Sequence, residues 1–328
     1  MIRVPFEELR DTFGRVLNDL GFHPEKADLL AETFAQNSLD GVYSHGLNRF
    51  PSFIEQVKKG VVVPDAEPEM VEQLGAAEIW DGQLAPGIYA ARRSMQRAME
   101  LAGQNGIGCV AIRNTNHWLR GGTYGWQAAD AGFSAICFTN ASASMAPWGG
   151  EEPRLGNNPL VIAVPREGGN IVLDMAISQF SYGKLQEYSF AGKELPFDGG
   201  YDEHGDLTRD PEKIAETKRA LPIGYWKGSG LAMLIDVLLV ALTGGKSVAG
   251  ITRSGHESSV CQCFIAFKRE DYNAQLIEEI IRYNRSSVPE GSGKNVRFPG
   301  ENTLLTRREN RESGIPVEEK IWNALRAM

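Results

Sequence analysis

Cysteine is scarce in this sequence, and its scarcity excludes a disulfide-stapled scaffold. Four cysteines in 328 residues are too few for such a framework and fit a reducing compartment. Cys261 and Cys263 are separated by one residue in an apolar run, so they could form a metal or redox pair. No second Cys or His pair lies near them at zinc-site spacing. Because residues i and i+2 of a strand share a face, we predict two buried thiols and no metal site.

Long hydrophobic runs and an excess of basic residues are also missing. The longest apolar run, Leu231–Leu242, is interrupted by Asp236 and is shorter than the roughly 20 residues that a bilayer requires. The chain does not open with the basic and apolar segments of a secretory signal. The formal net charge of −8 offers no general footprint for nucleic acid. We therefore expect a cytoplasmic protein with neither a membrane nor a nucleic-acid partner.

The usual nucleotide-binding motifs are absent as well. A Rossmann unit needs G-x-G-x-x-G between a strand and a helix, and the nearest candidate, Gly228–Met233, lacks the third glycine. Gly245-Lys-Ser247 resembles the end of a phosphate-binding loop, but the glycine required five residues earlier is Val240. A dinucleotide would therefore have to bind to a different fold.

The chain does contain a helical start followed by alternating helical and strand-like runs. Three helices are predicted in the first 60 residues, over Phe6–Leu20, over Glu25–Ser38 and from Ser44 onward, because apolar residues recur there at three- and four-residue steps. The predicted strands are Ile107–Arg113, Ser134–Thr139, Leu160–Pro165, Ile171–Met175 and Val260–Phe267. The later predicted helices are Gly87–Gly103, Thr123–Ala131, Tyr182–Gly192, Gly228–Leu242 and Asp271–Tyr283. The Gly228–Leu242 helix is apolar nearly all round and is expected to be buried. This pattern predicts an α/β or α+β fold with a large mixed sheet.

A first histidine lies in the segment Gly41–Phe50. Ser44 occupies the position of an N-cap, and His45 and Arg49 are four residues apart, which would place them on one face of the following helix. An arginine can hold a carboxylate by two parallel hydrogen bonds, and an imidazolium can donate a proton to a developing alkoxide. The alternative is that Ser44 only caps the helix, His45 is a surface residue and Arg49 pairs with a nearby acid.

A second histidine lies in the segment Arg113–Gly122, directly after a predicted strand. Asn116, His117 and Arg120 precede two glycines there. Ligands of α/β proteins gather at strand ends, and glycines allow the backbone to approach a ligand closely. The alternative is a solvated loop that leads into the next helix.

Three further segments carry weaker signals. Asp174, after an apolar run, could bind a ribose hydroxyl or simply close the strand. Trp226-Lys227 opens a helix, where a lysine and free N–H groups suit a phosphate. Phe298–Glu301 could serve in the same way or form a turn.

On Val42–Gly46, Asn116–Trp126 and Gly224–Gly230, the chain resembles the malate/lactate/sulfolactate dehydrogenase-like family over nearly its whole length. The resemblance implies a non-Rossmann NAD-binding fold built on a large mixed sheet with flanking helices. It further implies one unit over residues 1–328, in which residues 1–60 and the C-terminal helices surround the cofactor domain. Members of the family are homodimers with the active site near the subunit interface.

The same motif match assigns roles to individual residues. His45 resembles the proton donor, with Ser44 beside it, whereas His117 matches a position that some members use as the acid/base. Arg49, Asn116 and Arg120 are expected to bind the substrate. The cofactor positions implied are Asn170, Ile171, Val172, Leu173, Asp174, Met175, Ala176, Trp226, Lys227, Gly300, Glu301 and Asn302. The sequence departs from the most similar members at Glu301-Asn302, which replaces a His-Glu pair.

The resemblance implies reduction of a small sugar-derived oxo-acid, such as 2,3-diketo-L-gulonate to 3-dehydro-L-gulonate, with NADH preferred and NADPH possible. A malate, lactate or ureidoglycolate dehydrogenase of the same fold is an alternative. A sugar-acid binding protein without turnover is another, although the presence of Ser44, His45, Arg49 and His117 together opposes it.

Overall fold

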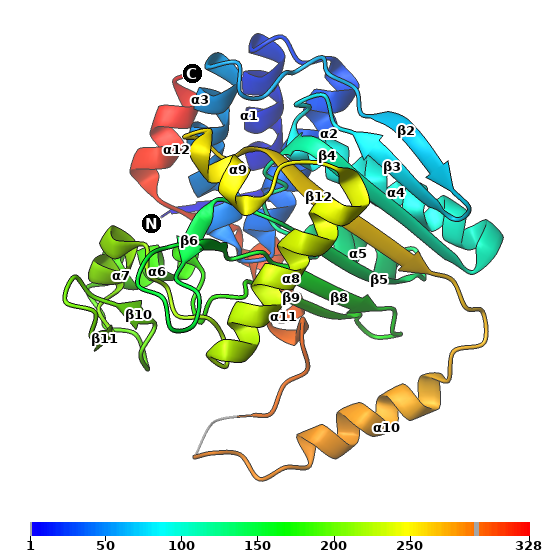
Figure 1. Ribbon diagram of the computed structural model, residues 1–328. Coiled ribbons are helices and arrows are strands. Elements are labelled where there is room, and N and C mark those ends of the chain that lie inside the picture. The colour runs from blue at the N-terminus through cyan, green and yellow to red at the C-terminus, as the bar shows by residue number, and fades with distance from the viewer. Residues whose placement is uncertain (1, 292–294) are drawn as a thin grey trace.

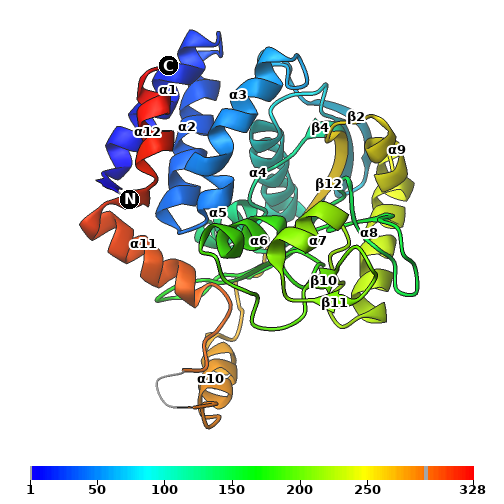
Figure 2. The ribbon, with the colours of Figure 1, turned by 90° about the vertical axis from the view of Figure 1, so that its left-hand side faces the viewer.

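The N-terminal part of the protein is a helical bundle that also takes up the C-terminal helix. The computed structural model describes residues 2–291 and 295–328. Helices α1 (Phe6–Asp19), α2 (Pro24–Leu39) and α3 (Phe50–Lys58) lie beside α12 (Glu319–Arg326) (Figure 2). Strand β1 (Ile2–Val4) pairs antiparallel with β13 (Ile315–Val317). The two ends of the described chain are thereby joined.

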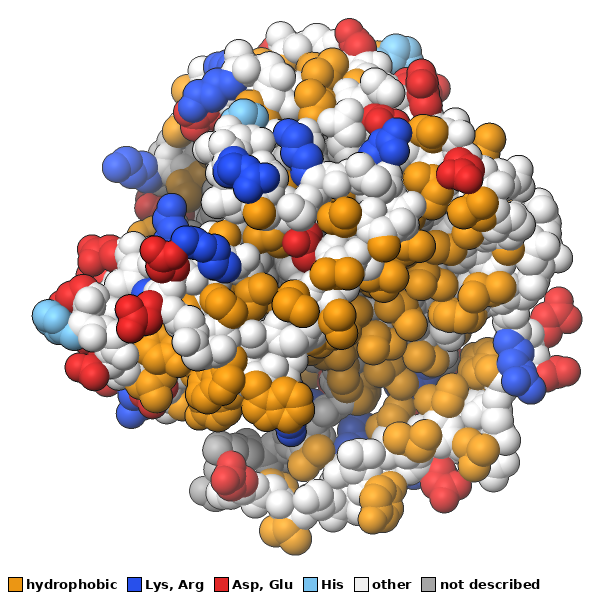
Figure 3. Space-filling view, in the orientation of Figure 1, with side chains coloured by type: hydrophobic (Ala, Val, Ile, Leu, Met, Phe, Trp, Pro, Cys, Tyr) orange, Lys and Arg blue, Asp and Glu red, His pale blue; other side chains and the backbone are white. Residues whose placement is uncertain are grey.

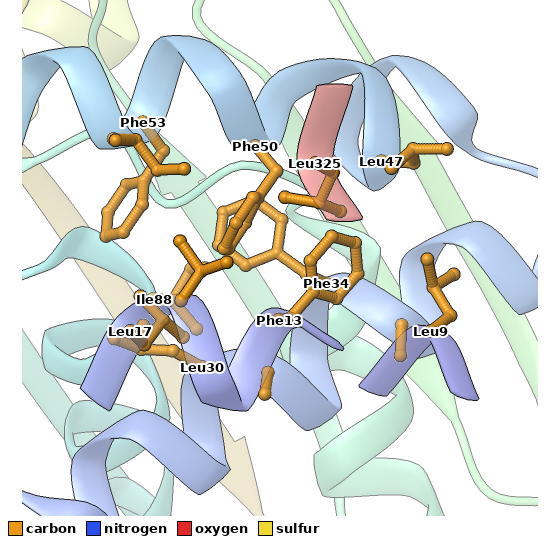
Figure 4. Close-up of a cluster of buried hydrophobic side chains, with 14 of the residues drawn as sticks. Leu9, Phe13, Leu17, Leu30, Phe34, Leu47, Phe50, Phe53, Ile88 and Leu325 are labelled. Carbon is orange, nitrogen blue, oxygen red and sulfur yellow. The ribbon is translucent and has the colours of Figure 1, made fainter. Parts of the chain in front are cut away.

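The predicted apolar stripes of these helices meet in one core. The ring centroid of Phe50 lies 4.3 Å from that of Phe13 and 4.9 Å from that of Phe34, and all three side chains are buried (Figure 4). Leu325 of α12 lies in the same cluster. Burial of one such aromatic side chain contributes roughly 1.5 to 3 kcal/mol, so this core fixes the helices that precede the first histidine.

A seven-stranded mixed sheet forms the centre of the protein (Figure 1). Its order is β2 (Glu69–Leu74), β3 (Ala77–Asp81), β4 (Ile107–Asn116), β12 (Ser258–Phe267), β5 (Ser134–Thr139), β8 (Leu160–Val164) and β9 (Ile171–Met175). Only the β3–β4 pair of this sheet is parallel. The predicted mixed sheet is confirmed, but β2 and β3 were not predicted. The exposed edge strand β2 lacks the apolar alternation on which sequence patterns depend.

Helices cover both faces of the sheet. α4 (Gly87–Asn105) and α5 (Gly122–Asp130) pack on one face with side chains such as Val110 and Phe264. α8 (Trp226–Thr243) packs on the other face, where both Cys261 and Cys263 are buried. The two thiols therefore share a face, as predicted, and no group of three or more metal-binding side chains occurs among the described residues.

The prediction that the Gly228–Leu242 helix is buried all round is wrong for the single chain. α8 turns Ala232 and Leu239 to the sheet but leaves Leu234 and Val237 60% and 53% exposed. An all-round apolar pattern shows that a helix is apolar, but it does not show how many of its faces are covered within one chain.

α8 is also the one helix in the described part long and apolar enough to cross a membrane. Its Asp236, however, accepts hydrogen bonds from Asn140 and from the Val248 backbone.

Several smaller elements surround this centre. α6 (Tyr182–Phe190), α7 (Pro211–Thr217), β10 (Gly200–Tyr201) and β11 (Leu207–Thr208) form a small lobe beside the sheet, and α9 (Val248–Arg253) follows α8 (Figure 1). β6 (Ala143–Met145) pairs with β7 (Leu155–Gly156). α10 (Ala274–Arg285) stands away from the body in both ribbon views, and α11 (Glu301–Ser313) returns the chain to the bundle.

Candidate active site

The first histidine segment is built from two short 3-10 turns, Tyr43–His45 and Leu47–Arg49, ahead of α3. The prediction that a helix begins at Ser44, with Ser44 as its N-cap, is therefore wrong. Gly46, at φ −113° and ψ −123°, interrupts the helical geometry. It does so because the segment lies against α2: a Cβ at Gly46 would fall 2.1 Å from Ser38 Oγ. Ser38 Oγ instead accepts a hydrogen bond from the Leu47 N–H at 2.9 Å.

The second histidine segment begins inside the sheet. β4 continues to Asn116, three residues beyond the predicted end at Arg113, and His117 follows directly. The Asn116 amide donates to the carbonyl oxygens of Leu84 and Ala85 at 2.8 and 3.1 Å. The structure therefore uses this predicted substrate ligand to hold the chain ahead of α4.

The two segments bring His45 and His117 together. Their rings are stacked, with centroids 6.0 Å apart and planes 16° apart. His45 Nδ1 lies 3.0 Å from Ser44 Oγ, whereas His117 Nδ1 accepts a hydrogen bond from the Leu119 N–H at 2.9 Å. An Nδ1 atom that accepts from an amide carries no proton. Neutral His117 must therefore carry its proton on Nε2.

Both histidines are neutral at neutral pH in this state. Burial, with a smaller contribution from the positive charge of Arg49, lowers the pKa of each to about 3. For His45, the neighbouring His117 and Arg120 act in the same direction. A negative ligand at Arg49 would offset this field, so the proton affinity of the pair depends on what the site holds.

Two adjoining cavities open from the histidine pair. Ser44, His45 and His117 line both of them. The first, called here the inner cavity, measures about 400 Å³ and extends toward β9 and Gly300. The second, the outer cavity, measures about 760 Å³ and extends past Arg49 toward α6 and α7. Two reactants could therefore meet at the histidines from opposite sides.

Arg120 lines the inner cavity within a buried ion network. Its Nη1 donates to Asp40 Oδ2 at 2.5 Å, and Arg307 donates to both oxygens of the same carboxylate. Although burial opposes it, hydrogen bonds from Arg307 and the charge of Arg120 hold the pKa of Asp40 below its usual value. Arg120 Nε is buried without a hydrogen-bond partner, 3.7 Å from Asp174 Oδ2. Neither Asp40 nor Arg307 was predicted.

Only some of the predicted cofactor residues reach the inner cavity. Those that line it are Val172, Leu173, Asp174, Ala176 and Gly300, whereas Asn170, Ile171, Met175, Glu301 and Asn302 lie next to them in the chain without lining it. Trp226 and Lys227 lie at the exposed start of α8, outside both cavities. Gly300, at φ +92°, packs against β9, and the Pro299 carbonyl accepts from the Val172 N–H at 3.0 Å.

These walls fit one end of a nicotinamide cofactor. Gly121 and Gly300 pack closely against the neighbouring chain: a Cβ at Gly121 would fall 2.8 Å from the Trp118 ring, and one at Gly300 would fall 3.1 Å from Val172 N. The unpaired Nε of Arg120 and the carboxylate of Asp174 offer polar partners beside the apolar side chain of Val172. A wall that combines such polar groups with an apolar side chain suits an organic ligand that has both polar and apolar parts.

Glu257 and α6 also contribute to the site, although neither was predicted to do so. Glu257 Oε1 lies 3.6 Å from His117 Nε2. Gly183 of α6 packs so closely on the first segment that a Cβ there would fall 2.7 Å from Ser44 Oγ. Glu257 lies just before β12, and nothing in the local sequence marks it as a partner of a residue 140 positions earlier.

The sequence matches a known protein family and several of its characterised relatives. Residues 4–326 match the malate/L-lactate dehydrogenase family. Over the full length of both chains, the sequence is 45% identical to the 2,3-diketo-L-gulonate reductase of Citrobacter koseri and 44% identical to that of Escherichia coli K12.

Solved structures agree. A malate dehydrogenase from Entamoeba histolytica superposes with a TM-score of 0.93 at 25% identity, covering 99% of this chain and 96% of that one. The sulfolactate dehydrogenase of Methanocaldococcus jannaschii gives 0.89 at 29% identity, covering 99% and 95%. This chain therefore belongs to the malate/L-lactate dehydrogenase family, whose oxidoreductases interconvert a CH–OH group and a keto group.

Proposed function

We propose that the protein reduces the keto group of a sugar-derived oxo-acid, specifically 2,3-diketo-L-gulonate to 3-dehydro-L-gulonate. This proposal rests on the stacked histidine pair, which lines both cavities. The inner cavity suits a cofactor, and the outer cavity contains Arg49. The full-length relatives named for this activity support the assignment. We also propose that residues 1–328 work as one unit.

The proposed roles of Arg49 and His45 follow from the positions of their polar atoms in the two cavities. Arg49 would bind the substrate carboxylate in the outer cavity. Ser44 Oγ occupies Nδ1 of His45, and no hydrogen bond from residues 2–291 or 295–328 reaches its Nε2. His45 Nε2 is therefore the nitrogen from which the keto oxygen would receive its proton. A nicotinamide cofactor, when bound, supplies the hydride for the carbonyl carbon.

The outer cavity favours a hydroxyl-bearing tail over a second acid group. Beyond Arg49, the carboxylates of Glu212 and Glu216, the hydroxyls of Ser142 and Ser189 and one further cation, Lys218, line it. A malate-like substrate would bring its second negative charge toward these acids, whereas sugar hydroxyls can donate to them. Lactate has no hydroxyl-bearing tail and would make none of these contacts. This lining supports a sugar acid against the malate and lactate alternatives.

For the cofactor, we propose NADH in preference to NADPH. Asp174 is the carboxylate of β9 that faces the inner cavity. A carboxylate accepts hydrogen bonds from a free ribose hydroxyl and repels a ribose phosphate. Val172, Leu173, Ala176 and Gly300 would form the remaining wall.

We further propose a cytoplasmic homodimer with two-fold symmetry. Figure 3 shows a continuous apolar area over the face that carries α8. Leu234, Val237 and Leu238 are about half exposed or more there. Exposed apolar area of this kind marks an interface, and a second copy is the commonest partner. The same helix begins with Trp226-Lys227, so a partner seated on this face could bring these two residues toward a cofactor site shared by both chains.

A panel of oxo-acids, assayed by the loss of NADH absorbance, tests the proposed activity. The panel should contain 2,3-diketo-L-gulonate, pyruvate, oxaloacetate and the ureidoglycolate product oxalurate. We expect the highest kcat/KM with 2,3-diketo-L-gulonate. Faster reduction of oxaloacetate or pyruvate would replace the substrate assignment, and binding without turnover of any compound would support the inactive binding protein.

A further inference from the structure

Glu257 is a carboxylate with no part so far in the proposed proton transfer, although it faces the histidine pair. It lies directly before β12, and its side chain is 26% exposed in the wall of the outer cavity. Its Oε2 accepts a hydrogen bond from the Ser142 N–H at 3.1 Å. Its Oε1 lies 3.6 Å from His117 Nε2. One oxygen thus anchors the carboxylate, and the other is directed at the histidine.

The geometry of His117 requires a partner of this kind. Because its Nδ1 accepts from the Leu119 N–H, the ring proton is on Nε2, on the side of Glu257. A carboxylate near an imidazole N–H fixes the ring orientation and tautomer and stabilises the protonated ring. Contacts of this length in an enzyme without substrate often shorten when the substrate binds.

Apart from Glu257, the charged groups around His117 oppose protonation of its ring. Arg49 faces it from the turn before α3, and the ring of His45 is stacked on it. Arg120 adds a second positive charge near His45. Glu257 is the carboxylate in direct contact with the pair among the described residues. It can therefore compensate for the cations that bind an anionic substrate.

We propose that Glu257 is a positioning residue for the reduction: together with the Leu119 N–H it supports the Nε2–H tautomer of His117, and it sustains a proton on the histidine pair while the keto acid is bound. The inference rests on the proposed function for its catalytic consequence. The proton and the hydride that the keto group gains are those of the reaction already proposed, and Glu257 itself gains or loses nothing over a cycle.

The test uses Glu257→Gln in the full-length protein. The glutamine carbonyl would accept from Ser142, which leaves its NH2 group facing the His117 N–H, so donor would meet donor. We expect kcat for keto reduction to fall about 10-fold to 100-fold, the range typical of an outer partner of a functional histidine. We also expect the loss of activity at high pH to move to lower pH, because the protonated pair loses its support. Glu257→Asp, which keeps the charge, should retain more activity and a pH profile closer to that of the wild type.

A second measurement needs neither substrate nor turnover. In 15N-labelled protein, the His117 ring signals, identified by their loss in His117→Asn, should show a protonated Nε2 in the wild type and a shifted tautomer population in Glu257→Gln. Glu270→Gln, in the exposed bend that follows β12, is the matched control and should change neither measurement.

The two proposals fail in different ways. If the wild type reduces no oxo-acid but the His117 tautomer still responds to Glu257→Gln, the proposed function is wrong and the Glu257–His117 pair stands. If Glu257→Gln leaves both the tautomer and the pH profile unchanged, the positioning role is overturned. A lower kcat in that variant without either change would mean a structural role only and would overturn it as well.

Discussion

Asp40 and Arg120, eighty positions apart in the chain, form a 2.5 Å ion pair at the edge of the inner cavity. Arg307 binds the same carboxylate from α11, so three distant elements meet at one buried group. Removal of one partner from a buried ion pair leaves an uncompensated charge and typically costs about 3 to 5 kcal/mol. This network links the stability of the fold to the position of an arginine that lines the site.

We therefore expect Asp40→Asn to lower the free energy of unfolding by about 3 kcal/mol. The same substitution should weaken NADH binding, because it displaces Arg120. Urea denaturation and NADH titration measure the two effects. Asp28→Asn, on the exposed side of the same helix α2, is the control. Because the folded-state pKa of Asp40 lies below its ordinary 3.8, its contribution is present above that pH and is lost as the pH falls through the folded value. Equal stability of the two variants would contradict the importance of the network.

His45→Asn should lower kcat for keto reduction by roughly 100-fold or more, as the loss of a general acid does. NADH affinity should barely change, because His45 touches the cavity only at the end where the two cavities meet. Steady-state kinetics and a cofactor titration decide this. If His45→Asn keeps wild-type turnover and His117→Asn is inactive, His117 is the proton donor instead.

Arg49→Lys should raise KM for the oxo-acid, since lysine keeps the charge but loses the two-pronged contact with a carboxylate. The pKa values of His45 and His117 should stay low in this variant because the positive charge remains. The measurement is KM against kcat at constant NADH. An unaltered KM would remove Arg49 from the carboxylate site.

Binding of an oxo-acid should be accompanied by proton uptake at acidic pH, between about 3 and 6.5. The carboxylate offsets the Arg49 charge, which together with the larger effect of burial depresses both histidine pKa values to about 3, so the values rise while burial still holds them below their ordinary 6.5. Titration calorimetry in buffers of different ionisation enthalpy measures the number of protons taken up. The His45→Asn/His117→Asn double variant should take up fewer, and equal uptake in both proteins would place the proton elsewhere.

The same low histidine pKa values predict how stability depends on pH. Groups whose pKa is depressed on folding contribute stability that is present above the unfolded value of 6.5 and is lost as the pH falls toward about 3. Denaturant unfolding from pH 7 to pH 4 should therefore show a smaller loss of stability in the double histidine variant than in the wild type.

Light scattering should give a dimer at concentrations where the enzyme is fully active. Leu234→Asp, on the exposed side of α8, should shift the protein toward monomer and reduce activity. Leu207→Asp introduces the same charge on the separate lobe of β11 and should leave the assembly intact. A fully active monomer would overturn the shared cofactor site.

Much of the local structure could be predicted from the sequence. The apolar stripes of α1 and α2 define helices because a period of 3.6 residues reports which side is buried. The five predicted strands carry their own apolar runs, and Cys261 and Cys263 share a face because strand geometry alone requires it. The sequence also marked candidate site residues, since His45, Arg49 and His117 stand in compact motifs next to turns and strand ends.

The tertiary structure alone decided which of these groups meet. The pairing of β4 with β12 sets Glu257, before β12, beside His117, at the end of β4. Tertiary packing then brings His45, from the turn before α3, against His117. Asp40, Arg120 and Arg307 become one network only when α2 and α11 pack together. Such contacts join residues 70 to more than 250 positions apart and leave no periodic trace in the chain. The exposure of α8 has the same origin, because hydropathy states how apolar a helix is, whereas packing determines which of its faces another surface covers.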